Sequence, residues 1–213
     1  MDGRTWGRSD YRVLLIVDIE EYSAAYRNDT IQVQLHADLR RLLITAFDDT
    51  GIEPGRYTMD TTGDGWLVSI DPAVGKPRIL GPVVDSLAVG LRERNGRTGE
   101  AERMRVRLVL HAGDLLVAGP YIVGRQVIHA FRLLDAEALR ILLRQASGPL
   151  LACVSDAVYQ QVIAQRHEGL DPAVYEPVWL ECKNVRALGW VRSPGEPGVA
   201  ARAGLLAPDA LTG

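Results

Sequence analysis

The sequence has little of what marks several specialised classes of protein. Only two of its 213 residues are cysteines, Cys153 and Cys182, which are too few for a disulfide scaffold and too far apart for a metal-ligand pair. The residues before the first apolar segment are polar, which excludes a signal peptide there. Apolar runs such as residues 13–17 are far shorter than the roughly 20 residues of a membrane span. We therefore expect a cytoplasmic protein without a membrane partner.

No sign of charge dominates the chain either. Lys and Arg together number 24 and Asp and Glu 27, which leaves a net charge of −3. A mildly acidic chain has no overall attraction to nucleic acid, so no nucleic-acid partner is expected. Hydrophobic residues make up 47% and charged residues 24% of the chain, which is typical of a folded globular protein and excludes a disordered one.

Apolar residues recur with the periods of both strands and helices. Short β-branched runs predict strands at residues 12–18, 57–70 (a pair around a Gly-Asp-Gly turn), 104–117 (with a turn at 112–114), 150–154 and 179–191 (a pair). Helical spacing predicts helices at residues 31–47, 79–91 and 127–143, and a short one within 155–163 capped by Ser155 and Asp156. This order predicts an α+β fold, with a ferredoxin-like βαββαβ core and a C-terminal αβ extension.

Interruptions of the pattern set the expected limits of the domain. Residues 1–10 are predicted to be an N-terminal extension and residues 11–192 one folded domain. Residues 193–213 are rich in Pro, Gly and Ala and show no periodicity, so a tail is expected. Within the domain, Gly119 and Pro120 interrupt the apolar pattern.

Two carboxylates stand at the ends of predicted strands. Asp18 ends the first strand, and Asp64 stands at the tip of the predicted hairpin. Antiparallel pairing of that hairpin beside the first strand would bring the two carboxylates together, and such a pair suits Mg²⁺ or Mn²⁺. The turn after Asp18 can offer backbone N–H groups to phosphates. The ordinary alternative is that each aspartate only caps a turn.

Two further residues each have a functional and a structural interpretation. His111, at a strand end, is expected to be a packed structural histidine, since no other histidine stands at metal-ligand spacing from it. Arg132 interrupts an apolar helical stripe, and a buried arginine needs an anion. Alternatively, its guanidinium lies in solvent along the helix face.

Taken together, these segments resemble the class III nucleotidyl cyclase catalytic domain, the adenylate/guanylate cyclase homology domain. The resemblance covers residues 12–191. No single motif in it is specific, but six motifs in the right order and at plausible spacing are moderately specific for the fold. The matching segments are VDIEEYS at 17–23, TTGDGWL at 61–67, RLVLHAG at 107–113, GRQVIHAFRLLDA at 124–136, LLACVSDAVY at 150–159 and CKNVRALGWV at 182–191.

The resemblance implies a homodimer whose active sites are shared between antiparallel subunits. Asp18 and Asp64 would bind two divalent cations, Mg²⁺ or Mn²⁺, with Ile19 as the third residue of the metal site. Arg132 would act as the catalytic arginine in the partner's site, and Lys183 would hold the terminal phosphates. The substrate would be a nucleoside triphosphate whose 3′-hydroxyl attacks the α-phosphorus and expels pyrophosphate.

The remaining substrate positions include departures from the family. The phosphates would lie against the turn formed by Glu20, Glu21, Tyr22 and Ser23. Asp60 stands where adenylate cyclases carry a lysine and guanylate cyclases a glutamate. A carboxylate accepts hydrogen bonds, which suits guanine, uracil or cytosine.

Two other departures concern the base and the ribose. Tyr121 falls at the second base-reading position, where it could stack on a smaller base, and Ile128 replaces the asparagine that orients the ribose. The sequence therefore predicts a nucleotidyl cyclase for a triphosphate other than ATP, either GTP or a pyrimidine nucleotide, in intracellular signalling. One alternative is a catalytically degenerate cyclase-like module that binds a nucleotide or only dimerises, and another is a different ferredoxin-like protein.

Overall fold

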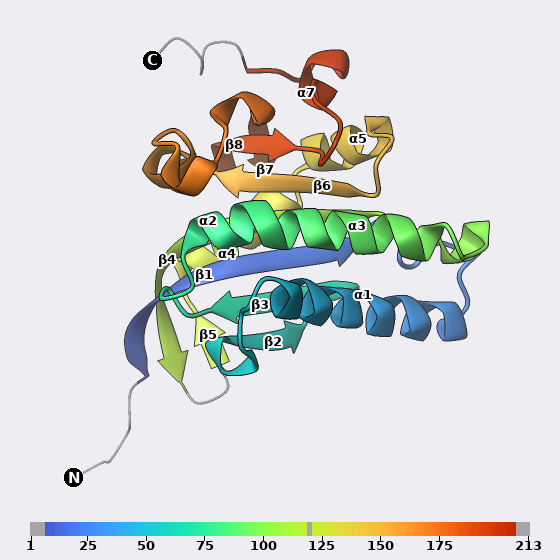
Figure 1. The fold of residues 1–213 in the computed structure, drawn as a ribbon, viewed down its shortest axis with the longest axis horizontal. Helices are drawn as coiled ribbons and strands as arrows, with labels where there is room; N and C mark the ends of the chain where they lie inside the picture. Colours follow the sequence, from blue (N-terminus) through green and yellow to red (C-terminus); the bar gives the residue numbers. More distant parts are fainter. Residues whose placement is uncertain (1–6, 119–120, 208–213) are drawn as a thin grey trace.

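The computed structural model describes residues 7–118 and 121–207. Their strands form one sheet in the order β2-β3-β1-β4-β6-β8-β7, with β5 added to β4 (Figure 1). The first four of these strands have the ferredoxin-like arrangement, and β6, β8 and β7 extend it, as the sequence predicts. The strands are β1 Arg8–Ile19, β2 Tyr57–Thr61, β3 Gly65–Ile70, β4 Val106–Ala118, β5 Tyr121–Val123, β6 Leu150–Ser155, β7 Glu176–Cys182 and β8 Val185–Arg192.

Helices cover both faces of the sheet. Successive residues of β1 point to opposite faces, so Leu15 packs under α1 and α3 while Leu14 packs under α4 and α5. In Figure 1 the long helices α1 and α3 lie in front of the sheet and α4 behind it. The helices are α1 Asp29–Asp49, α2 Lys76–Arg78, α3 Val84–Asn95, α4 Arg125–Leu134, α5 Glu137–Gln145, α6 Asp156–Val158 and α7 Val199–Arg202, with wider turns at Ile79–Val83 and Tyr159–Ile163.

The strand β4 differs from its prediction because it has no turn. It runs without interruption through Gly113, which pairs with Arg12 of β1. The glycine instead allows the side chain of Gln126 to pack closely against β4, since a Cβ atom at Gly113 would lie 2.7 Å from the Cγ of Gln126. Sequence alone cannot distinguish the two uses of a glycine.

The third predicted helix is two helices, α4 and α5. Ala136 between them has extended backbone, with φ −60° and ψ 131°. The apolar series also skips from Leu134 to Leu139, a step of five residues that no longer keeps one helical face. The change of direction lets both helices bury leucines against the same face of the sheet.

Three smaller differences concern the ends of elements. The first strand begins at Arg8, inside the expected N-terminal extension, of which residues 1–6 lie outside the described residues. Ser155 does not cap the helix after it, because its hydroxyl bonds to His111. In the expected tail, α7 forms and Val199 is buried against α5 and β7. Residues 119–120 and 208–213 lie outside the described residues, so the break expected at Gly119-Pro120 is not described.

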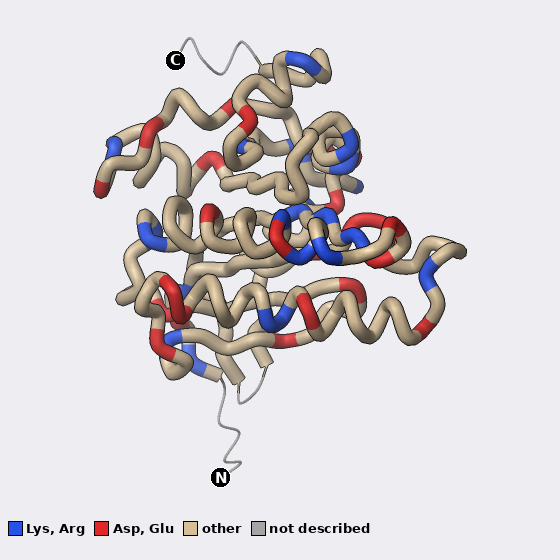
Figure 2. Tube along the Cα trace, turned by 45° about the vertical axis from the view of Figure 1, so that its right-hand side comes forward, with Lys and Arg blue, Asp and Glu red and all other residues tan. Residues whose placement is uncertain are grey.

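Lys and Arg are interspersed with Asp and Glu along the helices, as the view in Figure 2 shows. Among the described residues, no helix is both long enough and apolar enough to cross a bilayer.

Candidate functional site

Asp18 lies at the end of the central strand β1, between β3 and β4. Its register partners are Gly65 on β3 and Arg107 on β4. A Cβ atom at Gly65 would overlap the carbonyl of Val17, so only glycine lets the hairpin approach β1 this closely. The backbone N–H of Ile19 donates to the carbonyl of Asp64 over 3.1 Å, which fixes the hairpin tip beside Asp18. The predicted meeting of Asp18 and Asp64 therefore rests on strand register.

The carboxylate of Asp18 is buried and forms an ion pair with Arg107. Asp18 is only 6% exposed and Arg107 5%. Arg107 Nε donates to Asp18 Oδ1 over 3.1 Å, and its Nη2 donates to Oδ2. Burial raises the pKa of Asp18 to about 6, an effect that Arg107 opposes and the nearby charge of Asp64 increases.

Sequence analysis overlooked Arg107. It is a single arginine within a strand that is otherwise apolar on this stretch, and its Nη1 also donates to the carbonyl of Leu134 at the end of α4 over 3.2 Å. An arginine at such a position requires a buried anion, and Asp18 was already a candidate. The signal was present, but the pairing depends on the register of β1 against β4.

The donor set near Asp18 suits a hard divalent cation. Asp64 is exposed at the hairpin tip, and Ile19 is buried, so that only its backbone carbonyl could serve as a ligand. All these donors are oxygens, and a carboxylate that accepts hydrogen bonds from Arg107 still has lone pairs for a metal. The described residues contain no group of three or more His, Cys, Asp or Glu side chains placed to hold a metal. The fit therefore depends on two carboxylates and on oxygens from a ligand or water.

The turn after β1 has backbone N–H groups that find no acceptor in the described part of the chain. Glu20 N–H donates to the carbonyl of Arg105 over 2.8 Å, whereas the N–H groups of Glu21, Tyr22 and Ser23 make no hydrogen bond to described residues. Glu21 adopts a left-handed conformation with φ 55°, which turns the chain sharply at this point. Successive free N–H groups in such a turn form a concavity that suits an anion.

A buried arginine, also overlooked in the sequence, holds this turn. Arg27 Nη1 donates to the carbonyl of Glu20 over 2.8 Å, and its Nη2 donates to the carbonyl of Arg103 over 2.7 Å. Its Nε donates to the carbonyl of Ala101 over 3.2 Å. Arg27 thereby ties the turn to the segment that leads into β4, and no local pattern marks it because its acceptors are distant backbone carbonyls.

On α4, Arg132 and Ile128 face away from the core. Ile128 is 57% exposed, and residues four apart lie on the same side of a helix. Arg132 is half-buried and makes no hydrogen bond or ion pair to any described residue. The catalytic role of Arg132 therefore stays a prediction, and the residue has no anionic partner among the described residues.

His111 has the structural role expected of it. The ring is buried, its Nδ1 shares a hydrogen bond of 2.8 Å with the hydroxyl of Ser155, and its Nε2 is 2.8 Å from Gln126 Oε1. Burial lowers the pKa of His111. The ring of His129 lies 5.0 Å away. This network positions the first turn of α4 against β4.

Not all of the predicted substrate residues lie near Asp18. Asp60 is exposed on β2, level with Leu67 of β3, and so lies at the same end of the sheet. Tyr121 pairs with Ala118, eleven residues along β4 from Arg107, which is about 36 Å at 3.3 Å per residue. Lys183 lies in the β7–β8 turn, which projects past Ser155 towards that same remote end. A single chain therefore does not assemble the predicted site.

The fold matches solved structures of cyclase catalytic domains. No protein-family model matches the sequence, and no curated protein sequence matches it. The crystal structure of an adenylate/guanylate cyclase/hydrolase from Silicibacter pomeroyi is 23% identical, covers 88% of this chain and 99% of that chain, and gives a TM-score of 0.64. The guanylate cyclase domain of RhGC from Catenaria anguillulae in complex with GTP is 14% identical. The match covers 86% of this chain and 96% of that chain and gives a TM-score of 0.56.

A third structure belongs to the same group. The catalytic core of a rhodopsin-guanylyl cyclase with converted specificity, in complex with ATPαS, is 16% identical, covers 87% of this chain and 96% of that chain, and gives a TM-score of 0.59. The chain therefore has the fold of adenylate and guanylate cyclase catalytic domains.

Proposed function

We propose that the protein is a nucleotidyl cyclase that converts a nucleoside triphosphate into a 3′,5′-cyclic nucleotide and pyrophosphate. One observation carries the proposal: in a cyclase fold, β1 and the β2–β3 hairpin hold Asp18 and Asp64 side by side at one end of the sheet. Two divalent cations, Mg²⁺ or Mn²⁺, held by these carboxylates would activate the ribose 3′-hydroxyl and neutralise phosphate charge. The two cysteines are unpaired, which supports a cytoplasmic setting.

The residues of the chain have separate roles in this proposal. The free N–H groups of residues 21–23 bind phosphate oxygens, and Arg107 keeps the Asp18 carboxylate in a fixed orientation. Arg132 stabilises the charge that develops on the phosphates, and Lys183 holds the terminal phosphates. Asp60 accepts a hydrogen bond from the base, which favours GTP or a pyrimidine nucleotide over ATP.

The proposal requires two subunits, because Tyr121 and Lys183 lie at the end of the sheet remote from Asp18. A two-fold dimer places that end of one chain beside the metal site of the other. Three exposed apolar residues lie together on β4 and β5 at this remote end, which supports such an interface. The patch consists of Leu116, Tyr121 and Val123, which are 40%, 70% and 49% exposed.

The test is direct incubation of the pure protein with each of the four nucleoside triphosphates and Mn²⁺. Mass spectrometry should detect a cyclic nucleotide from GTP, UTP or CTP and little from ATP. Asp64→Ala should abolish the product, because one of the two carboxylates is lost, while circular dichroism stays unchanged. Formation of no cyclic product from any of the four would contradict the enzyme proposal.

The second candidate function is a nucleotide-binding or dimerisation module without activity. It is favoured by Ile128, whose side chain cannot hydrogen-bond a ribose. It is also favoured by Arg107, whose guanidinium donates to both carboxylate oxygens of Asp18 and so competes with a metal for them. In that case the same incubation should give no product, while calorimetry still detects binding of a triphosphate in the presence of Mn²⁺.

A further inference from the structure

An open pocket of about 370 Å³ lies where α3 ends and β4 and β6 begin. Its lining includes Arg92 and Asn95 of α3 and Arg103 and Arg105 just before β4. It also includes Ser147 and Gly148 of the loop before β6. Of these residues, only Arg105 also contacts the turn after β1, and none has been assigned to the proposed active site.

The lining of this pocket carries more positive charge than the neighbouring carboxylates balance. Three of the lining residues are arginines, and none is Asp or Glu. Arg92 and Arg103 are exposed, and neither forms an ion pair with a described residue. Among the described residues, the Arg92 side chain has one hydrogen-bond partner, the carbonyl of Pro194, which lies 3.4 Å from its Nη1. Both guanidinium groups therefore have donors available to a ligand.

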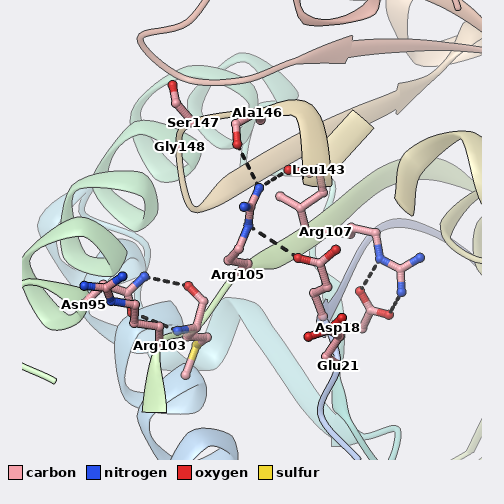
Figure 3. Close-up of polar contacts among 12 residues, drawn as sticks. Asp18, Glu21, Asn95, Arg103, Arg105, Arg107, Leu143, Ala146, Ser147 and Gly148 are labelled. Carbon is pink, nitrogen blue, oxygen red and sulfur yellow. Dashed lines mark hydrogen bonds and ion pairs between the residues drawn. The ribbon is translucent and has the colours of Figure 1, made fainter. Parts of the chain in front are cut away.

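Arg105 is held in position by polar contacts, which Figure 3 shows as dashed lines. Its Nη2 donates to the carbonyl of Ala146 over 2.9 Å and to that of Leu143. Its Nε lies 3.4 Å from Glu20 Oε2, and its Nη1 makes no hydrogen bond to a described residue. A side chain held in this way loses little conformational freedom when it binds a ligand.

Two carboxylates close to the pocket, Glu20 and Glu196, do not pair with Arg92 or Arg103. Glu20 faces Arg105 on the side of the β1 turn. Glu196 accepts hydrogen bonds from the N–H groups of Ser147 and Gly148, over 2.8 and 3.3 Å, and pairs with Arg202 at 2.6 Å. Neither neutralises Arg92 or Arg103.

We infer that this pocket, defined by Arg92, Arg103 and Arg105, binds the phosphate group of a small phosphorylated molecule. Guanidinium groups present pairs of N–H donors that match the oxygens of a phosphate, and the two without a carboxylate partner, Arg92 and Arg103, together balance the charge of a dianion. The volume lies within the range of about 300–1,000 Å³ that small-ligand sites occupy. The Ser147 hydroxyl adds a neutral polar group, which suits a hydroxyl group of a sugar phosphate or a mononucleotide, whereas the Asn95 amide is engaged by the backbone of Met104.

The experiment uses isothermal titration calorimetry of the whole protein without divalent metal. The probes are inorganic phosphate, pyrophosphate and a nucleoside 5′-monophosphate. At least one should bind with a dissociation constant of about 0.1–1 mM or tighter, and binding should weaken as salt is added. Binding of inorganic phosphate identifies a free-phosphate site, and binding of the monophosphate alone identifies a nucleotide site.

Matched variants separate this pocket from the proposed active site. Arg92→Gln with Arg103→Gln should weaken binding at least tenfold. The control, Arg97→Gln with Arg166→Gln, removes two other exposed positive charges that lie outside the pocket, and it should change the dissociation constant less than twofold. Asp64→Ala should bind the probes as the wild type does. The inference about the pocket therefore stands or falls separately from the proposed cyclase activity. Absence of saturable binding for all probes, or equal binding by the two double variants, would overturn the inference.

Discussion

Asp18 keeps a charge inside the protein because Arg107 lies against it. Both side chains are almost fully buried, and the desolvation of each is offset mainly by the other. The metal-binding aspartate of the proposed site is thus also part of the core. Asp64 has no such role, since it is exposed at a hairpin tip.

The first prediction compares the stabilities of the two aspartate variants. Asp18→Ala should lower the free energy of unfolding by about 3–5 kcal/mol, because it leaves the Arg107 charge buried and unpaired. Asp64→Ala should change it by less than about 0.5 kcal/mol, as expected for an exposed residue. Urea unfolding monitored by circular dichroism measures both. The double variant Asp18→Ala/Arg107→Met should recover much of the loss, and equal stabilities of the two single variants would contradict the ion-pair argument.

The second prediction concerns the pH dependence of stability. Burial holds the pKa of His111 below its ordinary 6.5 in the folded protein. Below about pH 6.5 the unfolded chain therefore binds more protons at this site than the folded one, and stability falls as the pH falls. The raised pKa of Asp18 acts in the opposite direction between about 4 and 6.

Comparison with His111→Gln isolates the histidine, because the Asp18 contribution cancels. Between pH 7.5 and 5.5 the wild type should lose more stability than the variant, by at most about 1.4 kcal/mol per pH unit. Gln can still donate and accept hydrogen bonds towards Ser155 and Gln126. Parallel pH profiles for the two proteins would show that His111 is not buried in its neutral form.

At the scale of elements, the approach of the β2–β3 hairpin to β1 decides whether a site exists. Gly65 allows it because it has no side chain where the carbonyl of Val17 lies. The third prediction is that Gly65→Ala lowers the free energy of unfolding by more than about 2 kcal/mol and weakens Mn²⁺ binding, since the hairpin must move away from Asp18. Denaturant titration and calorimetry measure the two effects.

Gly55→Ala serves as the control for Gly65→Ala. A Cβ atom at Gly55 would meet nothing within 4 Å, and its backbone does not require a glycine. Its stability should equal or slightly exceed that of the wild type. If Gly65→Ala behaved in the same way, the close approach of β3 to β1 would be wrong.

The elements also show where local pattern is insufficient. The helices α1 and α3 follow from apolar spacing, because each packs one face against the sheet. The uninterrupted β4 and the division between α4 and α5 do not follow from apolar spacing, since both depend on residues of other elements that pack against them. Gly113 is explained by the side chain of Gln126 above it, and the break at Ala136 by the leucines that α5 places against β6 and β7.

At the scale of the whole molecule, the fourth prediction is restoration of activity by mixing. Asp64→Ala chains and Arg132→Ala chains should each be inactive alone, because each dimer then lacks a needed group in both sites. In a mixed dimer both lesions fall in one site and the other is intact. With about half of the dimers mixed, roughly a quarter of wild-type activity should return. Failure to recover activity, with the wild type active in the same assay, would refute the shared site.

The fifth prediction tests the apolar patch as the dimer interface. Tyr121→Glu should raise the dimer dissociation constant at least tenfold, since a charge would replace an apolar contact. Val33→Glu is the control, because Val33 is also 70% exposed but lies on α1, away from the patch. Multi-angle light scattering over a range of concentrations measures both. A dimer affected equally by the two substitutions would place the interface elsewhere.

The sequence by itself determined the α+β class and the core faces of the first strand and the long helices, and it indicated Asp18 and Asp64 as a pair. These features depend on periodicity and turn residues, which are local properties of a chain. Only the tertiary structure decided that Arg107 neutralises Asp18, that Arg27 holds the turn, and that Tyr121 and Lys183 lie remote from Asp18. Each of these depends on strand register and on contacts between residues distant in sequence, where ion pairing and burial act across space and leave no periodic signal along the chain.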